Sequence, residues 1–172
     1  MQLIIETCLQ DFYLAIVSQE KTISYIHKKN LIKKSDELPL AFAEILKSLN
    51  IQPNHITDVF VTTGPGSFMG VRAGLLFAIT FCQITKAKIH TTDSLTFLSA
   101  GKPGKYYLDA KSNQSFFLDY PKQQSIQIID KHENSLMNYE LLIESPGVYQ
   151  KLFNQTRPLD VKANYIKEPK VG

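Results

Sequence analysis

Apolar and polar positions near the start of the chain form short runs that predict strands. Residues 3–5 and 13–17 are apolar, and residues 6–11, which join them, are more polar, which predicts a hairpin. Ile23, Tyr25 and His27 then alternate with polar residues, and this period of two predicts a third, half-exposed strand. The first 30 residues therefore predict a three-stranded meander.

The pattern next changes to helical spacing, in the apolar set Leu38, Phe42, Ile45, Leu46 and Leu49. Ser35 is the expected cap of this helix, Asn50 its expected end, and Pro39 is expected in the first turn, where its missing N–H does little harm. A buried-type strand at 58–62 leads to a glycine turn and a long helix over 67–85.

Further strands are expected at 88–91, 105–109 and 115–120, the last extended by 126–129, with a short helix over 94–100 capped by Ser94. Beyond residue 130 the periodicity weakens, and 148–153 fits a short helix or a strand. The order βββαβαβα followed by strands predicts a mixed α/β sheet. This is the chain order of a ribonuclease-H-like half, so we expect an N-terminal domain over 1–104 and a shortened C-terminal lobe over 105–172.

The turn before the long helix has the sequence Thr-Gly-Pro-Gly-Ser-Phe-Met-Gly-Val-Arg-Ala-Gly at residues 63–74, with Ser67 as the expected cap. Small residues recur at every fourth position: Gly66, Gly70, Gly74, Ala78 and Cys82. Glycine inside a helix costs up to about 1 kcal/mol relative to alanine, so something must come close to this backbone. Three interpretations remain open: the chain's own sheet, a partner helix, or a phosphate at the helix N-terminus.

Composition narrows the function classes only slightly. Hydrophobic residues make up 44% and charged residues 20%, and the net charge of +3 permits contact with nucleic acid without requiring it. The longest apolar stretch is broken by Arg72, Thr80 and the glycines, so we expect no membrane span, and the N-terminus predicts no signal peptide. Cys8 and Cys82 read as core residues, and two cysteines are too few for a disulfide framework, so we expect a cytoplasmic protein. The four histidines lack the spacing of metal ligands, so we expect no metal site.

Residues 64–74 closely resemble the motif Gly-Pro-Gly-Ser-Phe-Thr-Gly-x-Arg-x-Gly of the TsaB (YeaZ) family, with Met69 in place of the threonine. The resemblance extends to Glu6-Thr7-Cys8, where the family has Asp-Thr-Ser or Asp-Thr-Ala, to Asp93-Ser94-Leu95, and to 108–111, which is similar to an Asp-Ala-Arg turn. Residues 158–167, with Tyr165-Ile166-Lys167, faintly resemble a C-terminal Pro-x-Tyr-Leu-Arg. The resemblance is specific over residues 1–120 and weak beyond them.

The resemblance implies an actin-like ATPase (ASKHA) fold with a reduced second lobe and no catalytic site of its own. It implies a scaffolding subunit of the machinery that makes threonylcarbamoyladenosine at position 37 of tRNA. Its partners would be a TsaD-like catalytic subunit and a TsaE-like ATPase, with tRNA contacted through the complex. No cofactor would be held firmly by this chain alone, and ATP would bind in the assembled complex.

In that family the helices of the N-terminal domain form the subunit interface. This agrees with the interpretation of the small residues at every fourth position of the long helix as a docking face for a partner helix. The expected partner-binding residues are therefore Gly66, Ser67, Phe68, Gly70, Val71, Arg72, Gly74, Ala78, Phe42 and Leu46. The same ridge leaves open a homodimer of the isolated chain.

Single polar residues leave alternatives open. Glu6 is read as a strand-end carboxylate rather than a magnesium site, and Asp109 as a turn cap rather than a catalytic base. Arg72 fits a partner contact or a solvated or internally paired side chain. The stretch from Lys28 to Lys34 reads as a solvated loop, with contact to tRNA phosphates as the alternative. The rival function is an autonomous ATPase or small-molecule kinase of the actin-like group, which would need tight binding of ATP with magnesium.

Overall fold

The computed structural model describes residues 1–166, and its main feature is a six-stranded sheet in the order β3-β2-β1-β4-β5-β9. Its strands are β1 (Gln2–Glu6), β2 (Phe12–Ser18), β3 (Lys21–Lys28), β4 (Asp58–Thr62), β5 (Lys88–Thr92) and β9 (Asn154–Thr156). The β1–β2–β3 meander is antiparallel, as predicted, whereas β1, β4 and β5 are parallel to one another. The predicted order βββαβαβα is confirmed.

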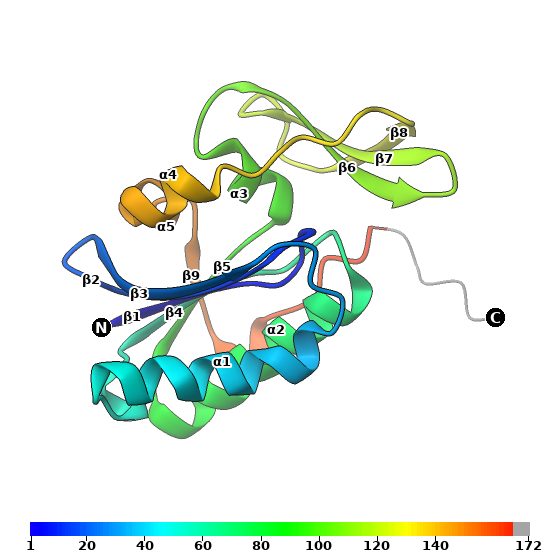
Figure 1. Ribbon diagram of the computed structural model, residues 1–172. Coiled ribbons are helices and arrows are strands. Elements are labelled where there is room, and N and C mark those ends of the chain that lie inside the picture. The colour runs from blue at the N-terminus through cyan, green and yellow to red at the C-terminus, as the bar shows by residue number, and fades with distance from the viewer. Residues whose placement is uncertain (167–172) are drawn as a thin grey trace.

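Within residues 1–166, five helices flank this sheet on its two faces (Figure 1). On one face lie α1 (Lys34–Leu49) and α2 (Phe68–Thr85). On the other lie α3 (Ser94–Ser99), α4 (Tyr139–Glu144) and α5 (Pro146–Gln150). Two short 3-10 turns, η1 (Pro53–His55) and η2 (Pro158–Asp160), complete the connections.

A second, three-stranded antiparallel sheet stands above the α3 side of the large sheet (Figure 1). It consists of β6 (Gly104–Lys111), β7 (Gln114–Tyr120) and β8 (Gln127–Asp130), close to the predicted ranges. After β8 the chain passes through α4 and α5 and returns to the large sheet. There β9 pairs antiparallel with β5 and forms an edge strand. The predicted boundary at residue 104 coincides with the start of β6. Two independent domains stay a prediction, and residues 167–172 lie outside the described residues.

Two apolar cores lie on opposite faces of the large sheet because successive strand residues point to opposite sides. Leu3 and Ile5 of β1 pack under α1 and α2, whereas Ile4 between them packs toward α3 and α5. Both Cys8 and Cys82 are buried in the first core, as predicted. The weak periodicity after residue 130 reflects short elements, since α4, α5 and β9 have only six, five and three residues.

Helix starts were predicted less well than helix positions. Ser67 caps α2, as predicted, and accepts a hydrogen bond from the Gly70 amide at 3.2 Å. The predicted caps of the other helices are wrong. Asp93, rather than Ser94, caps α3 through its carboxylate, and α1 begins one residue before Ser35 without a side-chain cap. Pro39 consequently is the sixth residue of α1, two residues further in than expected.

Candidate functional site

The turn between β1 and β2 is organised around the buried carboxylate of Glu6. One oxygen accepts hydrogen bonds from the amides of Cys8 (2.6 Å) and Leu9 (2.8 Å), and the other accepts from the Thr62 hydroxyl at 2.7 Å. Glu6 is fully buried, and this burial raises its pKa above the ordinary value, while the three donors and Lys34 act in the opposite direction. The carboxylate therefore accepts hydrogen bonds from the β1–β2 turn and from β4 at the end of its strand.

Lys34 is the residue that sequence reasoning placed wrongly. Its side chain is only 4% exposed, and its ammonium group donates to the main-chain carbonyls of Thr7 (3.1 Å) and Leu9. The pKa of Lys34 is lowered by burial, and the negative charge of the neighbouring Glu6 opposes this shift only in part. The first residue of α1 is thus tied to the β1–β2 turn. A lysine beside other lysines gives no sequence signal for such burial, since only the fold places carbonyl oxygens around it.

The rest of the basic stretch divides between paired and exposed side chains. Lys28 forms an ion pair with Glu37 at 2.7 Å, and Lys29 and Lys33 are exposed. Contact of this stretch with tRNA stays a prediction for these three residues, whereas Lys34 is inaccessible.

The small-residue ridge of α2 packs against the same turn. A Cβ atom at Gly70 would stand 2.0 Å from the carbonyl oxygen of Thr7, and one at Gly74 would stand 2.4 Å from the Thr7 hydroxyl. A Cβ at Gly66 would stand 2.1 Å from the carbonyl oxygen of Cys8. The Thr7 hydroxyl also donates to the Gly70 carbonyl at 2.7 Å. The glycines are therefore required for close packing of α2 within this chain.

This packing corrects the physical premise of the predicted docking strip. Gly70, Val71, Gly74 and Ala78 are buried against the chain's own strands, so they are not available to a second protein in this conformation. Of the three interpretations of the ridge, internal packing is the one that the structure bears out. The role of the other predicted residues in partner binding stays a prediction.

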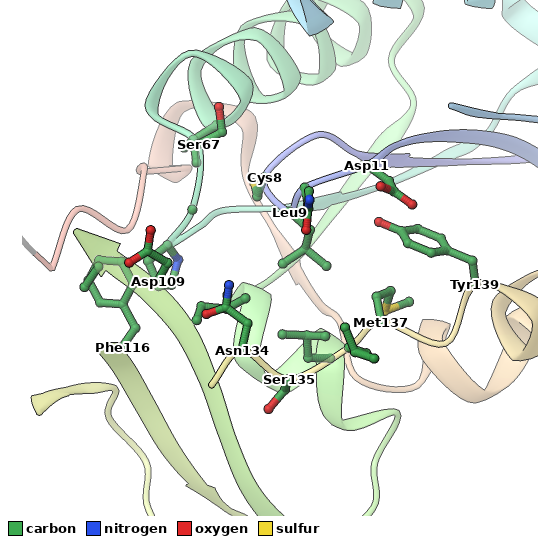
Figure 2. A pocket seen from close by; sticks show the side chains of 18 of the residues that line it. Cys8, Leu9, Asp11, Ser67, Asp109, Phe116, Asn134, Ser135, Met137 and Tyr139 are labelled. Carbon is green, nitrogen blue, oxygen red and sulfur yellow. The ribbon is translucent and has the colours of Figure 1, made fainter. Parts of the chain in front are cut away.

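The glycine turn also borders a cleft of about 1710 Å³ between the two sheets. Figure 2 shows Ser67 and Cys8 on one side, with Asp109 and Phe116 of the β6–β7 hairpin opposite and Asp11 and Tyr139 at the other end. Among the predicted partner-binding residues, Gly66, Ser67, Phe68 and Val71 line this cleft, whereas Gly74, Ala78, Phe42 and Leu46 do not. Sequence reasoning missed the far end of the cleft. There Asp11 pairs with His27 at 2.7 Å, and the ring of Tyr139 stacks on the His27 ring.

The Cys8 thiol at this cleft is held in its protonated form. Burial raises the pKa of the Cys8 thiol to about 12, so the thiolate needed for nucleophilic attack does not form at neutral pH. Within residues 1–166 no group of three or more His, Cys, Asp or Glu side chains could hold a metal ion.

Asp109 at the cleft rim caps the β6–β7 turn, as predicted. It accepts a hydrogen bond from the Lys111 amide at 3.0 Å and is paired with the side chains of Lys131 and Lys111. The hydrogen bond from Lys131, together with Lys111, lowers the pKa of Asp109 to about 2. The folded state thus holds this carboxylate in its charged form more strongly than the unfolded chain does.

Replacing Asp109 with asparagine should give a pH-dependent loss of stability. Because the pKa is lower in the folded state, the stabilisation is present above the unfolded value of about 4 and is lost as pH falls through about 2. Urea unfolding should show a difference of up to about 1 kcal/mol between native chain and Asp109→Asn at pH 7, in keeping with a partly exposed pair. That difference should shrink on acidification. A difference that stays constant down to pH 2 would contradict the assigned pairing.

The outward face of α1 and α2 carries large apolar side chains. Leu40 on α1 and Leu76 and Ile84 on α2 are 67%, 70% and 75% exposed, and Met69 is 58% exposed. Phe42 and Leu46 lie half-buried at the seam, where Phe42 contacts the rings of Phe77 and Phe81. We call Leu40, Leu76 and Ile84 the outer helix face, whereas Met69 also lines the cleft. Large apolar side chains exposed on two neighbouring helices are a feature of many interaction surfaces.

Two further features belong to this face. Arg72 is exposed and lies over the Phe68 ring at 5.4 Å, and within the described residues no acidic side chain forms an ion pair with it. By length and composition, α2 is apolar enough to cross a membrane, a test that buried core helices of soluble proteins also pass. Here the side of α2 that carries the small residues packs on the sheet, and larger side chains of the helix point outward.

Comparison with known proteins decides the family. A family model described as "TsaD: tRNA N6-adenosine threonylcarbamoyltransferase" matches residues 31–144, more than half of the 172-residue chain. The chain belongs to the TsaD family. The matched region runs from the residues before α1 through α4 and includes the glycine turn and the β6–β7 hairpin.

Solved structures agree with this TsaD-family fold. YeaZ from Pseudomonas aeruginosa superposes with a TM-score of 0.64 at 14% identity, covering 76% of this chain and 64% of YeaZ. A crystal structure described as an uncharacterized protein with similarity to peptidase YEAZ from Pseudomonas aeruginosa gives a TM-score of 0.77 at 12% identity, covering 96% of this chain and 99% of that one. The predicted ribonuclease-H-like, actin-like fold is therefore confirmed, as is the resemblance to YeaZ (TsaB).

A curated relative is similar over a short segment only. The "Uncharacterized protein MG208 homolog" of Mycoplasma pneumoniae is 42% identical over 41 residues, which is 24% of this chain and 21% of that protein. The chain thus matches about one fifth of this relative's length, and less than two thirds of YeaZ from Pseudomonas aeruginosa.

Proposed function

We propose that this chain is a non-catalytic, TsaB-type subunit that binds a TsaD-like catalytic subunit through the outer helix face. The observation that carries the proposal is the orientation of α2. The side of α2 that carries the glycines packs within the chain, whereas Leu76 and Ile84 on its other side are more than two-thirds exposed. Burying such side chains is worth about 1.5–3 kcal/mol each. A partner that covers this face would therefore gain most of its affinity there.

The partner would perform the chemistry, in which a threonylcarbamoyl group is transferred from its adenylate to the N6 amine of adenosine 37 in tRNA. Membership in a family described by that reaction supports the pathway, and the YeaZ-like fold supports the subunit type. In this proposal the complex is cytoplasmic, a TsaE-like ATPase acts on it, and ATP binds only in the assembled state.

The geometry of the β1–β2 turn argues against the rival, an autonomous ATPase or kinase. A phosphate-binding turn needs free backbone N–H groups. Here the amides of Cys8 and Leu9 donate to Glu6, and the carboxylate of Glu6 is fully buried. Calorimetric titration of the purified chain with magnesium and ATP should show no tight binding. Submicromolar binding would favour the rival.

Introducing a charge on the outer helix face should abolish association with the catalytic subunit. Leu76→Glu places a carboxylate in the centre of the buried interface, where an unpaired charge costs several kcal/mol, so we expect affinity to fall more than about 100-fold. The side chain is 70% exposed in the free chain, so the fold should persist. The measurement is a titration of native and variant chains against the TsaD-like subunit.

Leu136→Glu is the matched control, because Leu136 is 89% exposed and lies at the cleft on the other side of the large sheet. It should leave the affinity unchanged. If the Leu76 and Leu136 variants bind equally well, the outer helix face is not the docking surface. Light scattering of the isolated chain would show whether two copies pair through the same face, which Leu76→Glu should also prevent.

A further inference from the structure

Residues 157–166, which follow β9, run along one flank of α2, and we call them the strap. Because β9 is antiparallel to β5, the chain leaves the large sheet at the end where β5 begins, next to the C-terminus of α2. From there η2 packs against α2, and the Asn164 amide donates to the Thr63 carbonyl at 2.8 Å, close to the start of the helix (Figure 1). An 18-residue helix is about 27 Å long, which ten extended residues can span.

The strap is attached to the rest of the molecule by few interactions. Within residues 1–166, its one hydrogen bond to another element is the bond from Asn164. Its apolar side chains Val161 and Ala163 are half-buried against the first core, and Ile166 is half-buried against the second. Its one ion pair in the described residues lies within the strap itself. A segment with so few buried contacts and hydrogen bonds belongs to the least stable part of a fold.

The end of the strap covers the first turn of α2. The ring of Tyr165 lies against the ring of Phe68, with 5.3 Å between the centroids. Asn164 lies over the glycine turn, where a Cβ atom at Gly64 would meet the Asn164 carbonyl oxygen at 3.4 Å. Phe68 and Tyr165 are nevertheless 38% and 41% exposed, so this contact is made at the surface of the molecule.

The covered turn borders the surface that carries the outer helix face. Met69 and Leu76 are seven residues apart and therefore share one side of α2, and Phe68 is the neighbour of Met69. A partner that covers Leu76 and follows α2 toward its N-terminus consequently meets Tyr165 where that ring lies on Phe68.

We propose that the strap is a releasable cover, which detaches from α2 while the two sheets and their helices stay folded. Its release clears Phe68 and the glycine turn for a catalytic subunit. The control of docking rests on the proposed function, whereas release of the strap does not. A partner that binds only chains with a detached strap has an apparent Kd equal to its intrinsic Kd divided by the detached fraction. The attached strap therefore weakens docking.

Hydrogen exchange of the full chain at low urea concentrations tests the release. The amides of Asn164 and Thr63 form a matched pair, because each donates to one main-chain carbonyl, at 2.8 Å to Thr63 and at 2.9 Å to Thr92. After correction for intrinsic rates, the Asn164 amide should exchange about 100-fold faster, through a local opening that exposes little surface and so responds little to urea. Equal rates with the same urea dependence would overturn the proposal, since the strap would then open only with the whole fold.

Titration against the TsaD-like subunit tests the control of docking. Tyr165→Ser removes the ring contact with Phe68, increases the detached fraction, and should tighten binding about threefold to tenfold, the worth of one aromatic pair. The matched control is Tyr25→Ser, which removes a 47% exposed tyrosine of β3 and should leave the affinity unchanged.

Unchanged or weaker binding by the Tyr165 variant would overturn the strap's control of docking. Failure of the proposed function is recognised separately, by a Leu76→Glu chain that binds as well as the native chain. In that case the exchange rates of Asn164 and Thr63 still decide whether the strap detaches.

Discussion

Gly70→Ala should destabilise the chain by about 2 kcal/mol or more, although alanine is the better helix former. The gain in helix propensity is at most about 1 kcal/mol. Against it, the new Cβ would lie 2.0 Å from the carbonyl oxygen of Thr7, a main-chain atom that cannot rotate away. Either α2 or the β1–β2 turn must move by more than 1 Å, and overpacking of this kind commonly costs 1–3 kcal/mol or more.

Thermal unfolding is the measurement for this variant, and we expect a decrease in Tm of about 5 °C or more for a chain of this length. Gly147→Ala in α5 is the matched control, because its Cβ would meet its nearest neighbour, the side chain of Glu20, at an ordinary 3.5 Å. That variant should be neutral or slightly more stable. A Gly70→Ala chain as stable as the native one would show that the ridge is not packed as described.

Lys34→Met should have an effect of similar or greater size for an electrostatic reason. The positive charge of Lys34 lowers the pKa of the buried Glu6, and this substitution removes that charge. It also leaves the carbonyls of Thr7 and Leu9 without the ammonium group that donates to them. Each buried carbonyl left without its donor costs about 1–3 kcal/mol, and the loss of the positive charge near Glu6 adds to this. Chemical denaturation should report this loss directly.

Two companions make the Lys34 result specific. Lys33→Met changes an exposed neighbour and should alter stability by no more than about 0.5 kcal/mol. Glu6→Gln combined with Lys34→Met removes both charges and should recover part of the lost stability. If the Lys33 and Lys34 variants are equally stable, the coupling between α1 and the β1–β2 turn is wrong.

The alternation and helical spacing of apolar residues predicted most of the fold because burial on one face leaves a periodic trace. The meander, α1, β4, α2, β5 and the β6–β7 hairpin all follow such traces. By contrast, β9 has three residues, of which two are exposed, so no periodic signal marks its pairing with β5. Caps were harder because Ser94 and Asp93 are both good cap formers, and local conformation decides between them.

The candidate site was harder still to predict from sequence. The glycine spacing correctly indicated a close approach to the backbone of α2, but spacing cannot tell whether the neighbour belongs to the same molecule. The structure assigns that neighbour to Thr7 and Cys8, more than 55 residues earlier in the chain. The proposed docking surface therefore uses the opposite side of α2, where Leu76 and Ile84 would read as ordinary core residues in the sequence.

Hydrogen exchange of the chain with and without a TsaD-like subunit tests the docking claim most directly. The account predicts that amides of α1 and α2 gain protection on binding, while those of β6, β7 and β8 exchange at unchanged rates. Protection confined to the small sheet, with α1 and α2 exchanging as they do in the free chain, would contradict it.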